Sequence, residues 1–297
     1  MAENTKERNY LLFTDTDTDI TPEVAAYYGY NLISMPYAVD GKEILPYIDF
    51  NRFDCHAFYD SLRKGVMPKT STLSPVDYVK YLEPAFAQGK DVLYVHFSAA
   101  MSGTFNALTI AEQELKAKYP ERKLYRLDTK GITILSYNIV REVGDLYLAG
   151  KSVEEILEWA KTEVDKFTVY FFANDLSFFR RSGRVKALAA VMGNLLGIRP
   201  IIYMNDEGMM TSVDKARGMN ATLDKIFDYV AKLQDDIKSH RVIIGHSDDL
   251  KTVELVKERL IKEYGDDLNI EVVEVNPTAG SHCGPDAIGV CFHAIHR

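Results

Sequence analysis

The sequence predicts an α/β protein built from two closely packed domains, an N-terminal domain at residues 1–165 and a C-terminal α/β domain at residues 166–297. Strand, loop and helix patterns alternate through the first half of the chain, an order typical of a parallel sheet with helices on its faces. A length of 297 residues suits about two domains of ordinary size. No internal repeat, low-complexity tract or flexible linker interrupts the chain, so the two domains are expected to touch.

The first predicted strand covers residues 10–13 and leads into an acidic loop at residues 15–19. A helix is expected to begin directly after this loop. Thr21 can cap it with a hydroxyl, Pro22 suits its first turn, and Glu23 places an acid at its positive end.

Two further strands are predicted in the first half, at residues 92–97 and 123–127, and a helical pattern follows each of them. The first of these helices is expected at residues 104–118. In a parallel sheet, ligands bind at the carboxyl ends of the strands. The loops expected at that edge begin at Asp15, Ser98 and Asp128.

A helical stretch at residues 153–167 is expected to lead into the second domain. The segment at residues 201–204 turns through Asn-Asp-Glu-Gly into residues 209–213, which is the turn chemistry of a β-hairpin. Other strands are predicted at residues 168–172, 242–245 and 270–275, with a helix at residues 250–264.

The composition is that of a soluble globular protein, with 46% hydrophobic and 26% charged residues. The net charge of −8 argues against a nucleic-acid partner, and no basic run predicts a stable membrane anchor. The polar N-terminus lacks the apolar stretch of a secretory signal. Cys55, Cys283 and Cys291 have the spacing of neither a disulfide framework nor a zinc site. We therefore expect a reduced, cytoplasmic protein without a metal.

Four short segments rich in small, hydroxyl or charged residues lie in predicted loops. Residues 69–75 precede a helix, and helix capping is the simplest interpretation of their hydroxyls. Residues 98–104 lie between a strand and a helix, where either an anion-binding cradle or a tight capping turn would fit. Residues 180–184 form a charge run, which usually marks a solvated face. In residues 280–285, glycines on both sides of His282 predict a sharp loop that exposes it.

Taken in order, these segments resemble the DegV family, including the fatty-acid-binding subunits of bacterial fatty acid kinases. The similarity runs from about residue 10 to the C-terminus, and no single piece of it is specific. The family motifs Asp-Ser-x-x-Asp, Thr-Ser-Gln-Pro-Ser, Ser-Gly-Thr, Gly-Arg, Lys-Pro-Ile and His-Thr-Gly-Pro-Gly are similar to residues 15–19, 70–74, 102–104, 183–184, 199–201 and 282–286.

The resemblance implies a DegV-like fold with a lipid site between the two domains. One long-chain fatty acid would be held there, its carboxylate bound by Thr70, Ser102 and His282 and its acyl chain in an apolar tunnel. The protein would be a carrier that is not itself an enzyme and needs no other cofactor. It would present the carboxylate to a separate ATP-dependent fatty acid kinase, for which Arg217 matches a family arginine.

The sequence departs from the family pattern close to the proposed headgroup site. Thr72 and Leu73 replace glutamine and proline, Cys283 replaces a threonine, and Asp286 replaces a glycine. An acid at position 286 would either weaken anion binding or point into solvent. These changes bear on the identity of the ligand more than on the fold.

Two other functions fit parts of the sequence. A magnesium-dependent phosphatase of the haloacid dehalogenase type would use Asp17 and Asp19 of an Asp-x-Asp-x-Thr motif, with Ser98 and the acids at residues 248–249 in the later motifs. A binding protein for another small acid or lipid would share the same donors. An EF-hand lacks its glycine and glutamate, and a serine hydrolase lacks its Gly-x-Ser-x-Gly elbow.

Overall fold

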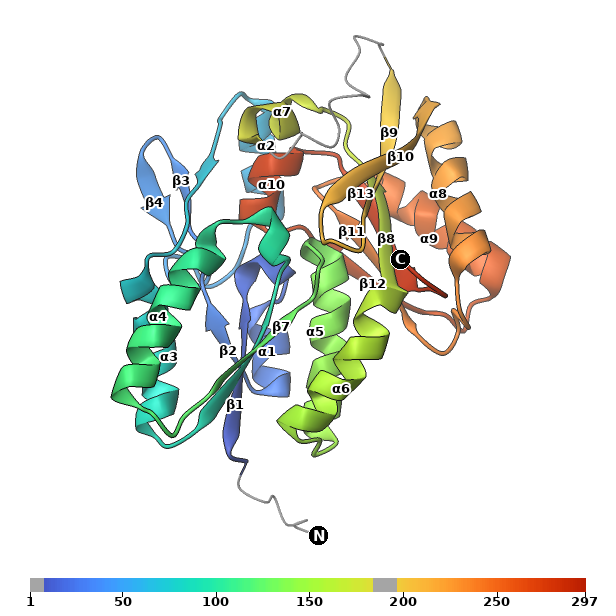
Figure 1. Ribbon diagram of the computed structural model, residues 1–297. Coiled ribbons are helices and arrows are strands. Elements are labelled where there is room, and N and C mark those ends of the chain that lie inside the picture. The colour runs from blue at the N-terminus through green and yellow to red at the C-terminus, as the bar shows by residue number, and fades with distance from the viewer. Residues whose placement is uncertain (1–7, 184–196) are drawn as a thin grey trace.

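The computed structural model describes residues 8–183 and 197–297. Its first sheet is entirely parallel and has the strand order β2-β1-β6-β7. These strands are β1 (Tyr10–Asp15), β2 (Tyr30–Ile33), β6 (Asp91–His96) and β7 (Leu124–Asp128). The predicted N-terminal parallel sheet is confirmed (Figure 1).

Helices cover both faces of the first sheet. One face packs against α3 and α4, and the other packs against α1, α5 and α6. The expected cap is present at the start of α1, where the amide of Val24 donates to the hydroxyl of Thr21. These helices are α1 (Pro22–Tyr28), α3 (Pro75–Ala87), α4 (Thr104–Lys118), α5 (Thr133–Leu148) and α6 (Val153–Glu163).

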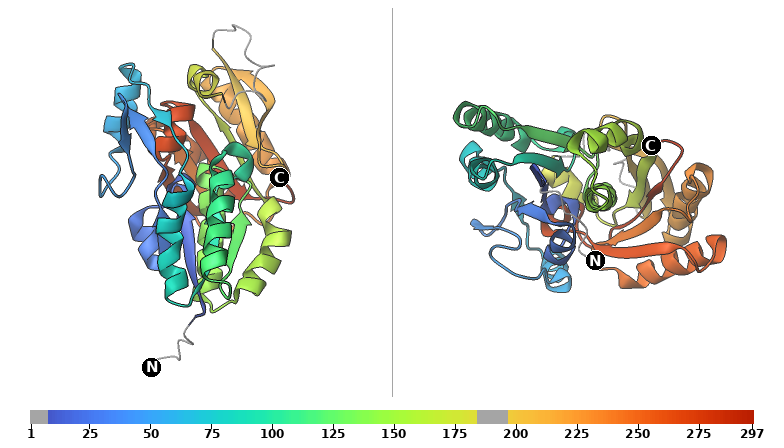
Figure 2. Two further views of the ribbon diagram at one scale, coloured as in Figure 1. Left: turned by 60° about the vertical axis from the view of Figure 1, so that its left-hand side comes forward. Right: turned by 90° about the horizontal axis from the view of Figure 1, so that it is seen from below.

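A small antiparallel sheet and one helix, for which the sequence provided no prediction, stand beside the first sheet. The sheet has the order β4-β3-β5, and its strands are β3 (Tyr37–Val39), β4 (Lys42–Ile44) and β5 (Lys69–Thr70). Helix α2 (Cys55–Arg63) lies between β4 and β5 in the chain. Both lie at the same end of the molecule as α7 (Ser177–Ser182) and α10 (Pro277–Cys283) (Figures 1 and 2).

The second sheet is mixed, with the order β10-β9-β8-β13-β11-β12. All its pairings are antiparallel except that of β11 with β12. The predicted hairpin is confirmed as β9 and β10, whereas the central strand β13 was not predicted. The strands are β8 (Phe167–Phe172), β9 (Ile198–Met204), β10 (Met210–Arg217), β11 (Arg241–His246), β12 (Asn269–Glu274) and β13 (Ile288–His293).

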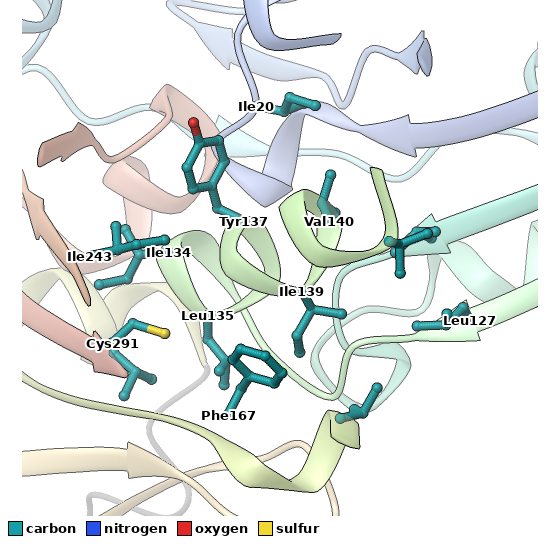
Figure 3. Close-up of a cluster of buried hydrophobic side chains, with 14 of the residues drawn as sticks. Ile20, Leu127, Ile134, Leu135, Tyr137, Ile139, Val140, Phe167, Ile243 and Cys291 are labelled. Atoms are coloured by element: carbon teal, nitrogen blue, oxygen red, sulfur yellow. The ribbon is translucent and has the colours of Figure 1, made fainter. Parts of the chain in front are cut away.

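Helices α8 (Met219–Leu233) and α9 (Leu250–Tyr264) pack against one face of the second sheet. Its other face packs against α5, which also contacts the elements around the first sheet. Figure 3 shows α5 with Leu135 and Ile139 among the side chains of this shared core. The α/β class and the second sheet domain are therefore confirmed, while the division at residues 165 and 166 remains a prediction.

Within the described residues, no helix combines the length and the apolar character that spanning a membrane would require.

Candidate ligand-binding site between the sheets

The three residues predicted to bind a carboxylate line the same cavity. Thr70 is the last residue of β5, Ser102 lies two residues before the start of α4, and His282 lies in α10. The hydroxyl of Thr70 and Nε2 of His282 are 3.1 Å apart, within hydrogen-bonding distance. The fold thus brings together residues that are separated by 212 positions in the chain.

The cavity has a polar end and an apolar end. The centres of water molecules could occupy about 130 Å³ of it. Exposed Ser71 and Thr72 line the polar end beside Thr70, whereas the apolar end is lined by buried residues of α5 and of the second sheet, among them Ile134 and Val169. The polar end therefore lies at the surface and the apolar end lies inside the core.

Two serines of the hydroxyl-rich segments at residues 69–75 and 98–104 make capping hydrogen bonds. Ser74 caps α3 in a reciprocal capping box with Asp77. Ser98 accepts from the amide of Ala100 and donates to the carbonyl of Gly208. Capping is thus confirmed for Ser74 and Ser98, neither of which lines the cavity, whereas Thr70 and Ser102 do.

Ser102 stands at the amino end of α4. Its hydroxyl oxygen accepts a hydrogen bond of 3.2 Å from the amide of Thr104, and the hydroxyl proton remains available to a ligand. The N-terminus of a 15-residue helix also carries a partial positive charge. Both features favour an anion at this place.

The prediction that residues 280–285 form a loop is wrong, because residues 277–283 are helix α10. The two glycines serve packing and helix termination. A Cβ at Gly280 would lie 2.5 Å from the hydroxyl of Tyr59 on α2. Gly284 has a φ of 72° and ends the helix in a conformation that L side chains rarely adopt. His282 is therefore half-buried and held by a helix.

The acidic loop holds α10 in place. Oδ1 of Asp19 accepts from the backbone amide and the side-chain amide of Asn276, at 2.9 and 2.7 Å. Asn276 in turn caps α10 by accepting from the amide of Ala279. Burial raises the pKa of the Asp19 carboxyl to about 8, against the lowering effect of these hydrogen bonds. Asp19 thus links the first sheet to the helix that carries His282.

Asp15 is also fully buried, and its carboxylate accepts from the Tyr94 hydroxyl and the Phe97 amide. Burial raises its pKa, and nearby Asp17 raises it further. Asp17 lines the cavity. Asp17 is thus the acid in the cavity wall, and Asp15 is buried close to it.

A cluster of charged side chains ties α2 to the loop after β11 and to the loop before β13. The guanidinium of Arg63 donates to the carboxylates of Asp248 and Asp286, both at 2.6 Å. Nδ1 of His56 also lies 3.0 Å from Asp248. The acid at position 286 is therefore engaged by an arginine, which resolves how this departure from the family pattern is accommodated.

The other departures are equally well accommodated. Leu73 is buried against α3 and α4, and Thr72 lines the cavity. Burial raises the pKa of the Cys283 thiol to about 12, which disfavours the thiolate that nucleophilic chemistry needs.

Two residues named by the resemblance lie away from the cavity or outside the described chain. Arg217 is the exposed last residue of β10 and does not line the cavity. Gly183 ends α7 with a φ of 72°, and Arg184 lies outside the described residues.

Three of the residues that the phosphatase alternative would use make structural hydrogen bonds instead. Asp19 holds Asn276, Ser98 holds Gly208, and Asp249 caps α9. The part of the chain that the structure describes contains no group of three or more His, Cys, Asp or Glu side chains placed to hold a metal ion.

Sequence reasoning missed the apolar half of the cavity. Its lining comes from α5 and from four strands of the second sheet, β8, β10, β11 and β13, and includes Gly245 and Gly289 inside β11 and β13. A glycine within a strand pattern indicates that another group approaches the backbone closely. Gly245 and Gly289 therefore offered a signal in the sequence for this part of the cavity.

Comparisons with known proteins agree with this architecture. The model of the DegV family of uncharacterised proteins matches residues 10–294. A DegV domain-containing protein of Clostridium perfringens is 30% identical over 286 residues, which are 96% of this chain and 97% of that protein.

Two solved structures have the same fold. One is described as showing fatty acid binding by a DegV family protein from Thermus thermophilus, with a TM-score of 0.84, 22% identity and coverage of 97% of this chain and 100% of that one. The other is a stearic-acid-binding protein from Eubacterium ventriosum, with a TM-score of 0.85, 19% identity and coverage of 96% and 98%. The phosphatase alternative gains no support from these relatives. The chain belongs to the DegV family.

Proposed function

We propose that the protein binds one long-chain fatty acid and presents its carboxylate to a separate ATP-dependent kinase, which forms the acyl phosphate. The observation that carries the proposal is the polarity of the cavity. Thr70, Ser102 and His282 lie at its open end, and buried apolar residues line its closed end. Fatty-acid binding is also what the solved relatives from Thermus thermophilus and Eubacterium ventriosum are described as doing.

The carboxylate would be bound by neutral donors and a helix end. A carboxylate that leaves water needs several hydrogen bonds, and the hydroxyls of Thr70 and Ser102 with the imidazole of His282 can provide them. Asp17 on the same wall opposes an anion through like charge. The hydrogen bonds from these donors therefore have to outweigh the repulsion by Asp17, so the loss of one donor should lower the affinity for the carboxylate strongly.

The acyl chain would be bound by contact with the apolar end of the cavity. Each buried methylene contributes about 0.8 kcal/mol, so a long chain can supply most of the affinity. This arrangement leaves the carboxylate at the open end, where exposed Ser71 and Thr72 form the rim.

Arg217 would act toward the partner kinase. Its position at the end of β10, exposed and outside the cavity lining, suits contact with another protein better than contact with the ligand. The experiment that tests both halves of the proposal compares Ser102→Ala with Arg217→Ala, using delipidated protein, a labelled fatty acid, ATP and a bacterial fatty acid kinase subunit.

The two variants should fail in different ways. Ser102→Ala should bind the fatty acid more weakly, whereas Arg217→Ala should bind it normally and lose acyl-phosphate formation. Normal binding by Ser102→Ala would reject the assigned headgroup site. Normal turnover by Arg217→Ala would reject the role of that residue, and no turnover by the unaltered protein would reject the kinase partnership.

A further inference from the structure

Two glycines face each other across adjacent strands at the apolar end of the cavity. Gly245 of β11 is the register partner of Gly289 of β13, and Gly289 is also the register partner of Phe171 on β8. All three residues line the cavity. Because neither glycine has a side chain, the sheet surface is hollowed where it faces α5.

The side chain of Ile134 fills this hollow from the opposite side. A Cβ at Gly245 would lie 2.6 Å from Cγ2 of Ile134, and a Cβ at Gly289 would lie 3.4 Å from its Cδ1. Ile134 is on the first turn of α5 and is 2% exposed. The isoleucine thus rests directly on the backbone of the glycine pair.

Along β11 and β13 the cavity lining stops at this contact, and on β8 it reaches Val169, which lies 3.6 Å from the position of a Cβ at Gly289. Ile243 and Cys291 are the next residues on β11 and β13 whose side chains point the same way; both are fully buried and neither lines the cavity. Figure 3 shows Ile134 beside Ile243, with Cys291 close by, on the side of α5 that faces the second sheet. Behind them, the amide of Asn138 donates to the carbonyl of Arg241 at 3.3 Å.

We infer that Ile134, seated on the Gly245–Gly289 pair, is the stop that sets the length of acyl chain the protein accepts. This inference rests on the proposed function. The methyl end of the chain would abut Ile134, so a longer chain would have to displace a packed core residue. A shorter chain would forgo contacts, at a cost of about fourfold in affinity per methylene group, equivalent to about 0.8 kcal/mol.

The test is a length profile. Delipidated protein is equilibrated with an equimolar mixture of saturated fatty acids of stepped length, and the bound acids are quantified by mass spectrometry. Ile134→Ala removes three side-chain carbons, so it should move the preferred length upward by up to roughly three carbons. Ile134→Val removes a single methyl and should shift the profile in the same direction by less.

Gly289→Ala should shift the profile toward shorter chains. The new Cβ would lie 3.0 Å from Cβ of Phe171 and would fill part of the hollow. Ile139→Val is the matched control for Ile134→Val, because Ile139 is on the same helix, fully buried and outside the cavity lining. It should leave the length profile unchanged at a similar loss of stability.

The outcomes separate the inference from the proposed function. An upward shift in Ile134→Val or Ile134→Ala, absent from Ile139→Val, supports the stop. If the unaltered protein binds fatty acids and these variants keep its length profile, the stop is wrong and the proposed function stands. If the unaltered protein binds no fatty acid, both are wrong. Should Ile134→Ala fail to fold, Ile134→Val decides the question.

Discussion

The two ends of the cavity are built in different ways. The open end is assembled from short elements, namely β5, the turn before α4 and helix α10, which come from distant parts of the chain and meet through side-chain contacts such as Thr70 with His282. The closed end is part of the main core, where α5 packs directly on the second sheet. Head group and chain length can therefore be altered separately, the first by polar substitutions and the second by changes of volume.

The link between the first sheet and α10 should show the largest effect. Asp19 joins the first sheet to α10, and burial raises its pKa from 3.8 to about 8. Because the folded state holds the proton more tightly, the stabilisation is fully present below about pH 4 and is lost as the pH rises to about 8, at about 1.4 kcal/mol per pH unit. Asp19→Asn should make this dependence shallower, with the contribution of buried Asp15 left in place, and urea unfolding at several pH values would measure the change.

The control for this experiment is Asp266→Asn, which alters an exposed acid outside the cavity lining. Its unfolding profile should follow that of the unaltered protein. If Asp19→Asn keeps the original slope between pH 4 and 8, the Asp19 carboxyl is not the source of the predicted pH dependence.

At the open end, His282→Ala should weaken fatty-acid binding by about 10- to 100-fold. The reason is that a hydrogen bond to a charged group contributes about 1.5–3 kcal/mol. Isothermal titration of delipidated protein would measure the loss. His296→Ala, which removes an exposed histidine outside the cavity lining, is the control, and equal binding by both variants would contradict the assignment of His282.

The smallest effect is expected for the ion pairs of Arg63 on α2. Arg63 pairs with Asp248 and Asp286, but its side chain is 31% exposed. Solvent screening limits such pairs to about 0.2–1 kcal/mol. Arg63→Met should therefore lower the free energy of unfolding only slightly while speeding release of the ligand, because α2 packs on α10. A fluorescent fatty acid in a displacement assay would report the release rate.

Lys161→Met provides the comparison for Arg63→Met, since the pair of Lys161 with Glu158 is exposed and lies on α6. It should change neither stability nor release. A release rate that Arg63→Met also leaves unchanged would show that the ion pairs of α2 do not affect the open end.

Elements defined by local signals were predictable from the sequence. Thr21 and Pro22 marked the start of α1, and the helix predicted at residues 104–118 has the bounds of α4. Helix α10 was missed because Gly280 and Gly284 are typical of a loop, whereas here they permit contact with Tyr59 and end the helix. The mixed order of the second sheet depends on pairings between distant strands, which local patterns do not encode.

The open end of the site was predictable only through the family resemblance. Neither Thr70 nor His282 is distinctive alone, and their contact spans most of the chain. The closed end could not be predicted, because Ile134, Gly245 and Gly289 are ordinary apolar or small residues until the fold brings them together.

The central claim is that the protein carries a fatty acid, and the most direct test is mass spectrometry of the organic extract from the purified protein. The account predicts one long-chain fatty acid per chain, retained by the unaltered protein and depleted in His282→Ala. A protein purified without fatty acid, which also fails to take one up after delipidation and reloading, would contradict it.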